Sequence, residues 1–148
     1  MSVLTLEYSR SIKASPTQVW EVIVDFDDYP EWNPFVTRCA SELTPGAPIV
    51  MSVNMGMFTT EQTEQVTRVE AESLFEYRMR PVGKLLYSKR QHRLAPSAAG
   101  GSCYTSYFEL RGWLSPLVGL FMGYFLRRGF SSMTAALVLR AEELAAQP

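Results

Sequence analysis

The chain has 148 residues, of which 47% are hydrophobic and 20% are charged. This composition is ordinary for a folded soluble protein, and the length predicts one domain, residues 1–148, with a sizeable hydrophobic core. The 14 Lys and Arg residues are balanced by 15 Asp and Glu residues. That balance gives no electrostatic case for nucleic-acid binding, which depends on a basic patch, so no nucleic-acid partner is expected.

The chain opens with a predicted strand followed by a capped helix. Leu4, Leu6 and Tyr8 alternate with polar residues, which predicts a strand that ends just before Ser15. Residues 15–18 read Ser-Pro-Thr-Gln. Serine can cap a first turn, proline suits the first helical position, and glutamine can complete a capping box. Apolar residues at helical spacing then predict a helix of about three turns, and prolines close behind it prevent a longer one.

Six further strands are expected between the helical segment and the last quarter of the chain. Each is rich in apolar, Thr or aromatic residues, and Gly, Pro and Ser clusters separate them as turns. The predicted strands span residues 35–43, 49–55, 58–69, 74–80, 85–94 and 103–113.

From Pro116 onward the pattern is helical. An apolar stripe runs over about thirty residues and consists of Phe121, Phe125, Leu126, Phe130, Met133, Leu137 and Leu144. Gly129 is the expected kink point of this helix. An antiparallel sheet of about seven strands must bury one face, and this helix is the element long enough to cover it. The predicted fold class is therefore α+β.

Residues 113–126 form the one strongly apolar run. The run is shorter than a membrane span, and Pro116 and two glycines interrupt it. A buried helix is therefore predicted and no transmembrane segment, with a transient membrane contact as the alternative.

The cysteine and histidine content predicts neither a secreted protein nor a metal-binding site. Cys39 and Cys103 lie far apart, and no secretory signal precedes them. We expect buried free thiols in the cytoplasm, with a disulfide as the alternative. One histidine and no closely spaced cysteine pair provide no metal site, and no phosphate loop or dinucleotide fingerprint is present, so neither metal nor cofactor is expected.

Residues 15–36 read SPTQVWEVIVDFDDYPEWNPFV. This segment resembles the polyketide cyclase/dehydrase-type branch of the START-like (SRPBCC) superfamily, whose pattern is a-s-p-x-x-V-W-x-v-x-x-D-f-x-x-y-p-x-W-N-p-f. The resemblance extends more weakly over the whole chain. It implies the helix-grip fold, in which a curved antiparallel sheet surrounds a long C-terminal helix and two short helices follow the first strand. The elements predicted from the residues agree with this layout.

The resemblance also implies a function. The leading hypothesis is that an internal cavity binds or carries a small hydrophobic molecule, such as a lipid or polyketide-like compound, with an acidic group as one option. A cyclase or dehydratase acting on such a compound is the first alternative, and a co-chaperone-like protein-interaction module is the second. No catalytic residue is assigned, although acid–base catalysis would have to use His92, Glu64 or Tyr77. Monomer and homodimer both remain open.

Large, pliable side chains are the candidate cavity wall, because flexible Met and aromatic residues suit apolar guests. These candidates are Met51, Met55, Phe58, Phe75, Tyr77, Phe108, Phe121 and Phe125. The alternative is that they pack against one another as core. Trp32 would either cap the cavity mouth or pack on the sheet. In relatives the last strand often reads E-x-F-x-G, and Phe108 stands here at the acidic position.

Two polar residues are predicted to point into the cavity. Relatives carry a strand resembling g-x-H-x-F-x-L-x-P, and in this chain Arg90 falls at the usual His position and His92 at the usual aromatic position. Strand periodicity places both on the face of the leucines at either end of the strand. A buried arginine needs an anion, because burying it unpaired costs several kcal/mol. Either Glu64 or a ligand carboxylate could supply that anion.

Overall fold

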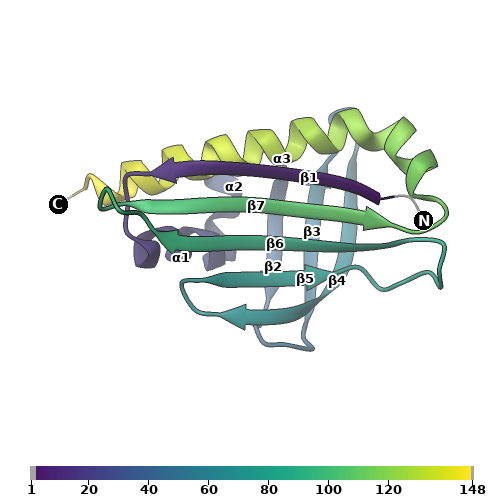
Figure 1. The fold of residues 1–148 in the computed structure, drawn as a ribbon, viewed down its shortest axis with the longest axis horizontal. Helices are drawn as coiled ribbons and strands as arrows, with labels where there is room; N and C mark the ends of the chain where they lie inside the picture. The colour runs from purple at the N-terminus through teal and green to yellow at the C-terminus, as the bar shows by residue number, and fades with distance from the viewer. Residues whose placement is uncertain (1–2, 148) are drawn as a thin grey trace.

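A computed structural model describes residues 3–147. Figure 1 shows one curved sheet with a long helix, α3, running along it. In chain order the elements are β1 (Val3–Ile12), α1 (Pro16–Val24), the 3-10 turn η1 (Phe26–Asp28), α2 (Tyr29–Trp32), β2 (Val36–Ser41), β3 (Pro48–Asn54), β4 (Thr59–Glu70), β5 (Leu74–Arg78), β6 (Tyr87–Pro96), β7 (Ser102–Arg111) and α3 (Ser115–Ala145). This order confirms the predicted α+β arrangement, with strand ends that differ by a few residues.

The seven strands form one antiparallel sheet in the order β1-β7-β6-β5-β4-β3-β2. The helical segment after β1 therefore carries the chain from one edge of the sheet to the other. Register shifts between Val36 and Arg38 and between Val66 and Arg68 mark irregular pairing in β2 and β4. Irregularities of this kind increase the local twist of a sheet. The twisted sheet presents a concave face to α3.

The start of α1 has the predicted capping box. The Ser15 hydroxyl accepts a hydrogen bond from the Gln18 backbone N–H at 3.2 Å, and the Gln18 side chain accepts one from the Ser15 N–H at 2.9 Å. Two backbone donors at the helix start are thereby satisfied. Val19, Val22 and Ile23 then bury the inner face of this helix.

The C-terminal half of α3 belongs to the core. Phe130, Met133 and Leu137 recur at helical spacing and are almost fully buried. Gly129 lies at the start of this half, where a Cβ atom would overlap the Phe35 ring. The glycine thus allows the helix to approach the segment before β2 closely.

The N-terminal half of α3 contains the apolar run that was expected to be buried. It is helical, but Leu120 is 78% exposed and Phe121 is 67% exposed. The prediction of burial is therefore wrong for the outer side of these turns, because the sheet covers only the inner side. In the part of the chain that the structure describes, no helix is long and apolar enough to cross a membrane.

Both cysteines are free thiols. Cys39 is buried as expected, whereas Cys103 is exposed. The prediction of burial was wrong for Cys103, because it lies between the inward-facing Ser102 and Tyr104 at the start of β7. Alternate residues of a strand point to opposite faces.

Candidate ligand-binding site

A pocket of about 330 Å³ lies between the concave face of the sheet and the N-terminal half of α3. The sheet provides most of its wall, and Val118, Met122 and Leu126 close it from the helix. The other apolar lining residues are Phe35, Val36, Met51, Val53, Met55, Phe58, Met79, Leu86, Phe108, Leu110 and Phe130. The polar ones are Thr60, Gln62, Glu64, Tyr77, Ser88 and Arg90. Such a volume and such a mainly apolar wall are typical of sites for small molecules.

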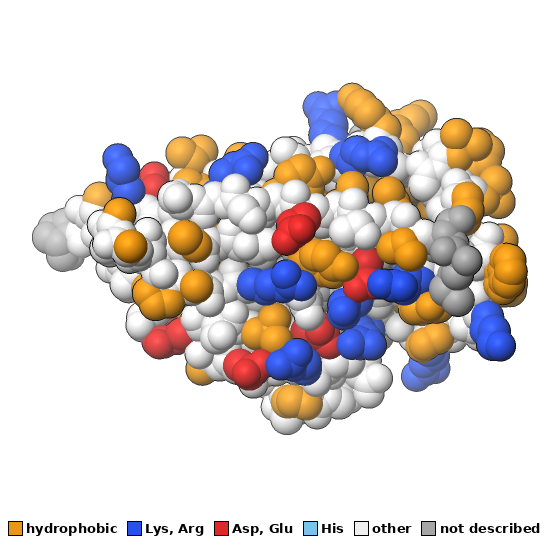
Figure 2. All heavy atoms as spheres, viewed as in Figure 1, with side chains coloured by type: hydrophobic (Ala, Val, Ile, Leu, Met, Phe, Trp, Pro, Cys, Tyr) orange, Lys and Arg blue, Asp and Glu red, His pale blue; other side chains and the backbone are white. Residues whose placement is uncertain are grey.

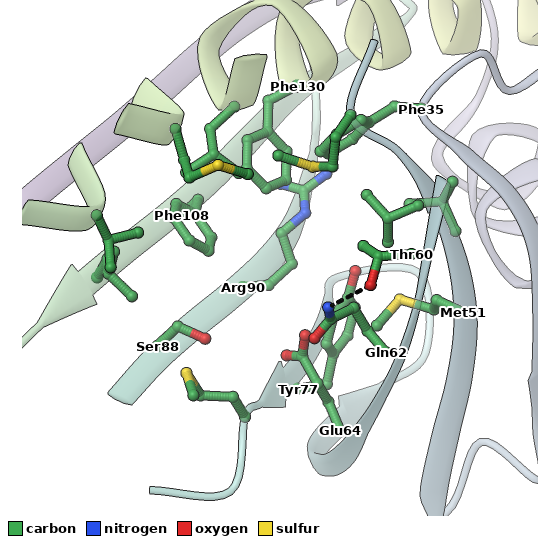
Figure 3. Close-up of a pocket in the computed structure, with 18 of the residues that line it drawn as sticks. Phe35, Met51, Thr60, Gln62, Glu64, Tyr77, Ser88, Arg90, Phe108 and Phe130 are labelled. Carbon is green, nitrogen blue, oxygen red and sulfur yellow. Dashed lines mark hydrogen bonds between the residues drawn. The ribbon is translucent and has the colours of Figure 1, made fainter. Parts of the chain in front are cut away.

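Seven of the twelve predicted site residues line this pocket, and Figure 3 shows how several of them converge on it. They are Met51, Met55, Phe58, Glu64, Tyr77, Arg90 and Phe108. The other five, Trp32, Phe75, His92, Phe121 and Phe125, lie outside its wall.

Phe75 and His92 have the predicted inward orientation but lie in a filled part of the concavity. Their rings stack with centroids 5.7 Å apart, and both side chains are almost completely buried. His92 Nδ1 lies 2.7 Å from the Tyr104 hydroxyl, and Phe26 packs against Phe75 from η1. The concave face is thus packed solid at this end, so periodicity located the correct face but not the open part of it.

Trp32, Phe121 and Phe125 lie elsewhere for different reasons. Trp32 packs edge-on against Tyr29, with centroids 5.2 Å apart. Phe121 points into solvent, and Phe125 lies over the backbone of Gly56. The pocket-facing residues of α3 recur every four positions, at 118, 122 and 126. Residues 121 and 125 are therefore rotated by one residue, about 100° around the helix, away from the pocket.

Residues missed by sequence reasoning include a group on α3 and one beside β2. Val118, Met122 and Leu126 have an i, i+4 spacing that marks one helix face. That signal was hidden because the residues between them are also apolar. Phe35 is the last aromatic residue of the W-N-P-F segment, and its ring packs edge-on against Phe130 at 4.8 Å.

Arg90 is the most unusual group of the site, because its side chain is only 2% exposed. Its Nη1 donates to the Ser106 hydroxyl at 2.6 Å, to the Gln91 carbonyl at 3.3 Å and to the Tyr107 carbonyl at 3.4 Å. The guanidinium lies over the Phe130 ring, 4.7 Å from its centroid. Every one of these partners is electrically neutral.

No carboxylate among residues 3–147 forms an ion pair with Arg90. The direct Arg90–Glu64 pair considered as the internal alternative is therefore not formed, and Figure 3 shows the guanidinium turned toward Phe130, away from Glu64. Within the same described residues, Arg90 Nε has no hydrogen-bond partner. The site holds a buried cation with unused donor capacity.

Glu64 and Tyr77 form a polar wall of the pocket, and Tyr77 is the cross-strand partner of Arg90. Burial raises the pKa of Glu64 to about 7, although the positive charge of Arg90 opposes this shift. Burial likewise raises the pKa of Tyr77, again against the influence of Arg90. Near neutral pH a large fraction of Glu64 is therefore a neutral carboxylic acid that can donate a hydrogen bond. In the described residues, no three His, Cys, Asp or Glu side chains gather to hold a metal ion.

The chain matches the protein family described as "Polyketide cyclase / dehydrase and lipid transport" over residues 3–143. Its structure is similar to the Zhui aromatase/cyclase from Streptomyces sp. R1128, with a TM-score of 0.78 and 13% identity over 96% of this chain and 95% of that one. Norcoclaurine synthase from Thalictrum flavum gives a TM-score of 0.72 with 16% identity, over 97% of this chain and 96% of that one.

A protein of unknown function from Staphylococcus aureus gives a TM-score of 0.74 with 11% identity, over 99% of this chain and 98% of that one. At such identities these likenesses show the shared helix-grip fold alone. No curated protein sequence matches this chain.

Proposed function

Because this chain belongs to the polyketide cyclase/dehydrase and lipid transport family, we propose that its pocket binds or carries a small hydrophobic molecule that bears an acidic group. The apolar part of this ligand lies among the Met and Phe side chains of the wall. Its acidic end lies at Arg90. The same fold supports unrelated activities in different proteins, and it is the pocket of this chain that supports this function.

The observation that carries the proposal is the unpaired, buried guanidinium of Arg90. An arginine cannot lose its proton, and its burial without an anion costs several kcal/mol. Neutral oxygens and an aromatic face offset part of this cost, but the Nε donor remains unused. A ligand carboxylate in the pocket would supply both the missing charge and the missing acceptor.

Binding of dodecanoic acid and of dodecanol, measured by isothermal titration calorimetry, tests this role. The two probes share an alkyl chain and differ in the charge of their polar end. We expect Arg90→Met to weaken dodecanoic acid by about 10- to 100-fold, as typical for loss of hydrogen bonds to a charged group. Dodecanol binding should change little, because methionine retains the apolar contacts.

Arg93→Met is the matched control, because Arg93 lies on the same strand but on the opposite face, over the Tyr107 ring. It should leave both affinities unchanged. Equal weakening of acid and alcohol by Arg90→Met would argue against recognition of a carboxylate. Marked loss of stability in the ligand-free Arg90→Met protein would instead assign Arg90 a purely structural role.

A cyclase or dehydratase activity is the second candidate, and Glu64 is the residue that favours it. A carboxyl group with a pKa of about 7 can both accept and donate a proton at neutral pH. The polar wall places it beside Tyr77 in the same pocket. If the protein catalyses such a reaction on a poly-β-ketone, Glu64→Gln should abolish turnover while dodecanoic acid still binds.

A further inference from the structure

The outer side of the first turns of α3, together with Trp113 before the helix and Met57 in the turn between β3 and β4, forms an unusually apolar surface. Six large side chains are more than half exposed: Met57 at 83%, Trp113 at 68%, Leu117 at 53%, Leu120 at 78%, Phe121 at 67% and Tyr124 at 65%. We call this group the α3 patch. Single exposed apolar residues are common, but a contiguous group marks an interaction surface. Figure 2 shows hydrophobic side chains gathered at the end of the molecule where α3 begins.

Backbone hydrogen bonds and one side-chain contact hold three segments together at this end of the molecule. The Trp113 N–H donates to the Lys84 carbonyl at 3.2 Å, and the Leu114 N–H donates to the Leu85 carbonyl at 2.9 Å. The Phe125 ring lies against Gly56 in the turn between β3 and β4. The loop between β5 and β6 and the β3–β4 turn therefore flank the α3 patch.

The charges of these segments are all of one sign. Residues 54–60, 79–90 and 113–141 contain no Asp or Glu, although the chain carries a net charge of −1. The acidic residues are therefore confined to the rest of the chain.

Four exposed cations lie in these segments: Arg80 and Lys84 in the β5–β6 loop, and Arg127 and Arg128 on α3. None of them forms an ion pair with a carboxylate in the described part of the chain. Exposed apolar side chains beside unpaired cations match the two layers of an anionic membrane surface, which are acyl chains and phosphate groups.

We propose that this end of the molecule docks reversibly on membranes that contain anionic phospholipids. The α3 patch enters the boundary between head groups and acyl chains, and the four cations contact the lipid phosphates. The inner side of the same helical turns lines the pocket through Val118, Met122 and Leu126. Docking therefore places the pocket next to the lipid, and it does not depend on which ligand the pocket binds.

Co-sedimentation with vesicles tests the proposal. We expect the protein to bind vesicles of phosphatidylcholine mixed with phosphatidylglycerol, and to bind phosphatidylcholine alone much more weakly. The double substitution Leu120→Glu/Phe121→Glu should abolish binding. Leu139→Glu is the matched control, because Leu139 is 70% exposed near the other end of the same helix, and it should bind as the original protein does.

The role of the cations is tested separately. Arg127→Gln/Arg128→Gln should weaken binding to the anionic vesicles by roughly 30-fold, since each basic residue near such a surface contributes about 1 kcal/mol. Arg10→Gln/Arg38→Gln changes the net charge equally at exposed sites outside the patch and should have little effect.

Three results would overturn the proposal. The first is failure to bind either kind of vesicle, and the second is equal binding to both kinds. The third is a dimer in solution that Leu120→Glu/Phe121→Glu dissociates while no vesicle binding occurs, because the α3 patch would then be an interface between two copies of this chain.

Discussion

At the scale of single residues, Arg90 and Glu64 respond differently to burial in one pocket. Arg90 keeps its charge, and the structure surrounds it with the Ser106 hydroxyl, two backbone carbonyls and the face of Phe130. Glu64 can lose its charge, and burial raises its pKa to about 7. The proton of Glu64 is therefore linked to the stability of the fold.

We expect Glu64 to make the protein less stable as the pH rises from about 5 to 8. The carboxyl ionises near pH 4.5 when unfolded and near 7 when folded, so its favourable contribution is complete at low pH and is lost as the pH rises through 7. Glu64→Gln cannot ionise. The free energy of unfolding of the original protein, relative to this variant, should fall by at most about 3 kcal/mol over this range.

Urea unfolding at several pH values measures this difference. Burial, together with the charge of Arg90, lowers the pKa of His92, so His92 opposes Glu64 by favouring folding as the pH rises. That contribution is common to both proteins and cancels in the difference. Glu61→Gln, at an exposed position of the same strand, is the control and should follow the original protein. A difference that does not change with pH would contradict the prediction.

At the scale of elements, the close approach of α3 to Phe35 depends on Gly129. A Cβ atom there would overlap the Phe35 ring, which itself packs against Phe130. We expect Gly129→Ala to lower the free energy of unfolding by about 1–3 kcal/mol, as overpacking of a core does. Gly119→Ala should instead be neutral or stabilise by up to about 1 kcal/mol, because its nearest neighbour is a Leu4 methyl group at 3.8 Å.

Thermal or urea unfolding of the two variants gives both values. Both glycines lie within α3, so the comparison separates the cost of overpacking against Phe35 from the gain in helix propensity. Equal stabilisation by both substitutions would mean that Phe35 moves aside at no cost.

The elements themselves were largely predictable, and the limits of that prediction have physical causes. Ser15 and Gln18 correctly indicated the start of α1. Strand periodicity correctly predicted that the side chains of Arg90 and His92 point to the inner face of the sheet. Periodicity does not tell which part of a face another element fills, so His92 and Phe75 were assigned to a pocket that ends before them.

The rotation of α3 could not be predicted for a related reason. Its first turns carry apolar residues on all sides, including Phe121 toward solvent and Met122 toward the pocket. An apolar stripe identifies one buried face only when the other face is polar. The apolar residues on the solvent side of these turns belong to the α3 patch, where the apolar sequence pattern predicts burial but the fold leaves the side chains exposed.

At the scale of the whole molecule, the concave face is divided into two regions. At one end, Phe26, Phe75, His92 and Tyr104 form a continuous aromatic cluster. At the other end, the N-terminal half of α3 covers the pocket. The aromatic cluster and the candidate binding site therefore occupy different ends of the same sheet, and substitutions in the pocket should cost less stability than substitutions in the aromatic cluster.

The unequal halves of α3 have a consequence for motion. Residues 130–141 are anchored by Phe130, Met133 and Leu137, whereas residues 116–126 have the pocket on one side and solvent on the other. Segments with few buried contacts open locally at a lower free energy than the core. We expect the amide hydrogens of residues 118–126 to exchange with deuterium much faster than those of 130–141 in the ligand-free protein.

Dodecanoic acid, if it fills the pocket, should slow exchange in 118–126 selectively, because a ligand stabilises the closed form to which it binds. Uniform exchange along the helix, measured by mass spectrometry or NMR, would contradict this expectation. A helix that opens at its first turns while its last turns stay fixed gives a pocket ligand a way in and out without unfolding the sheet.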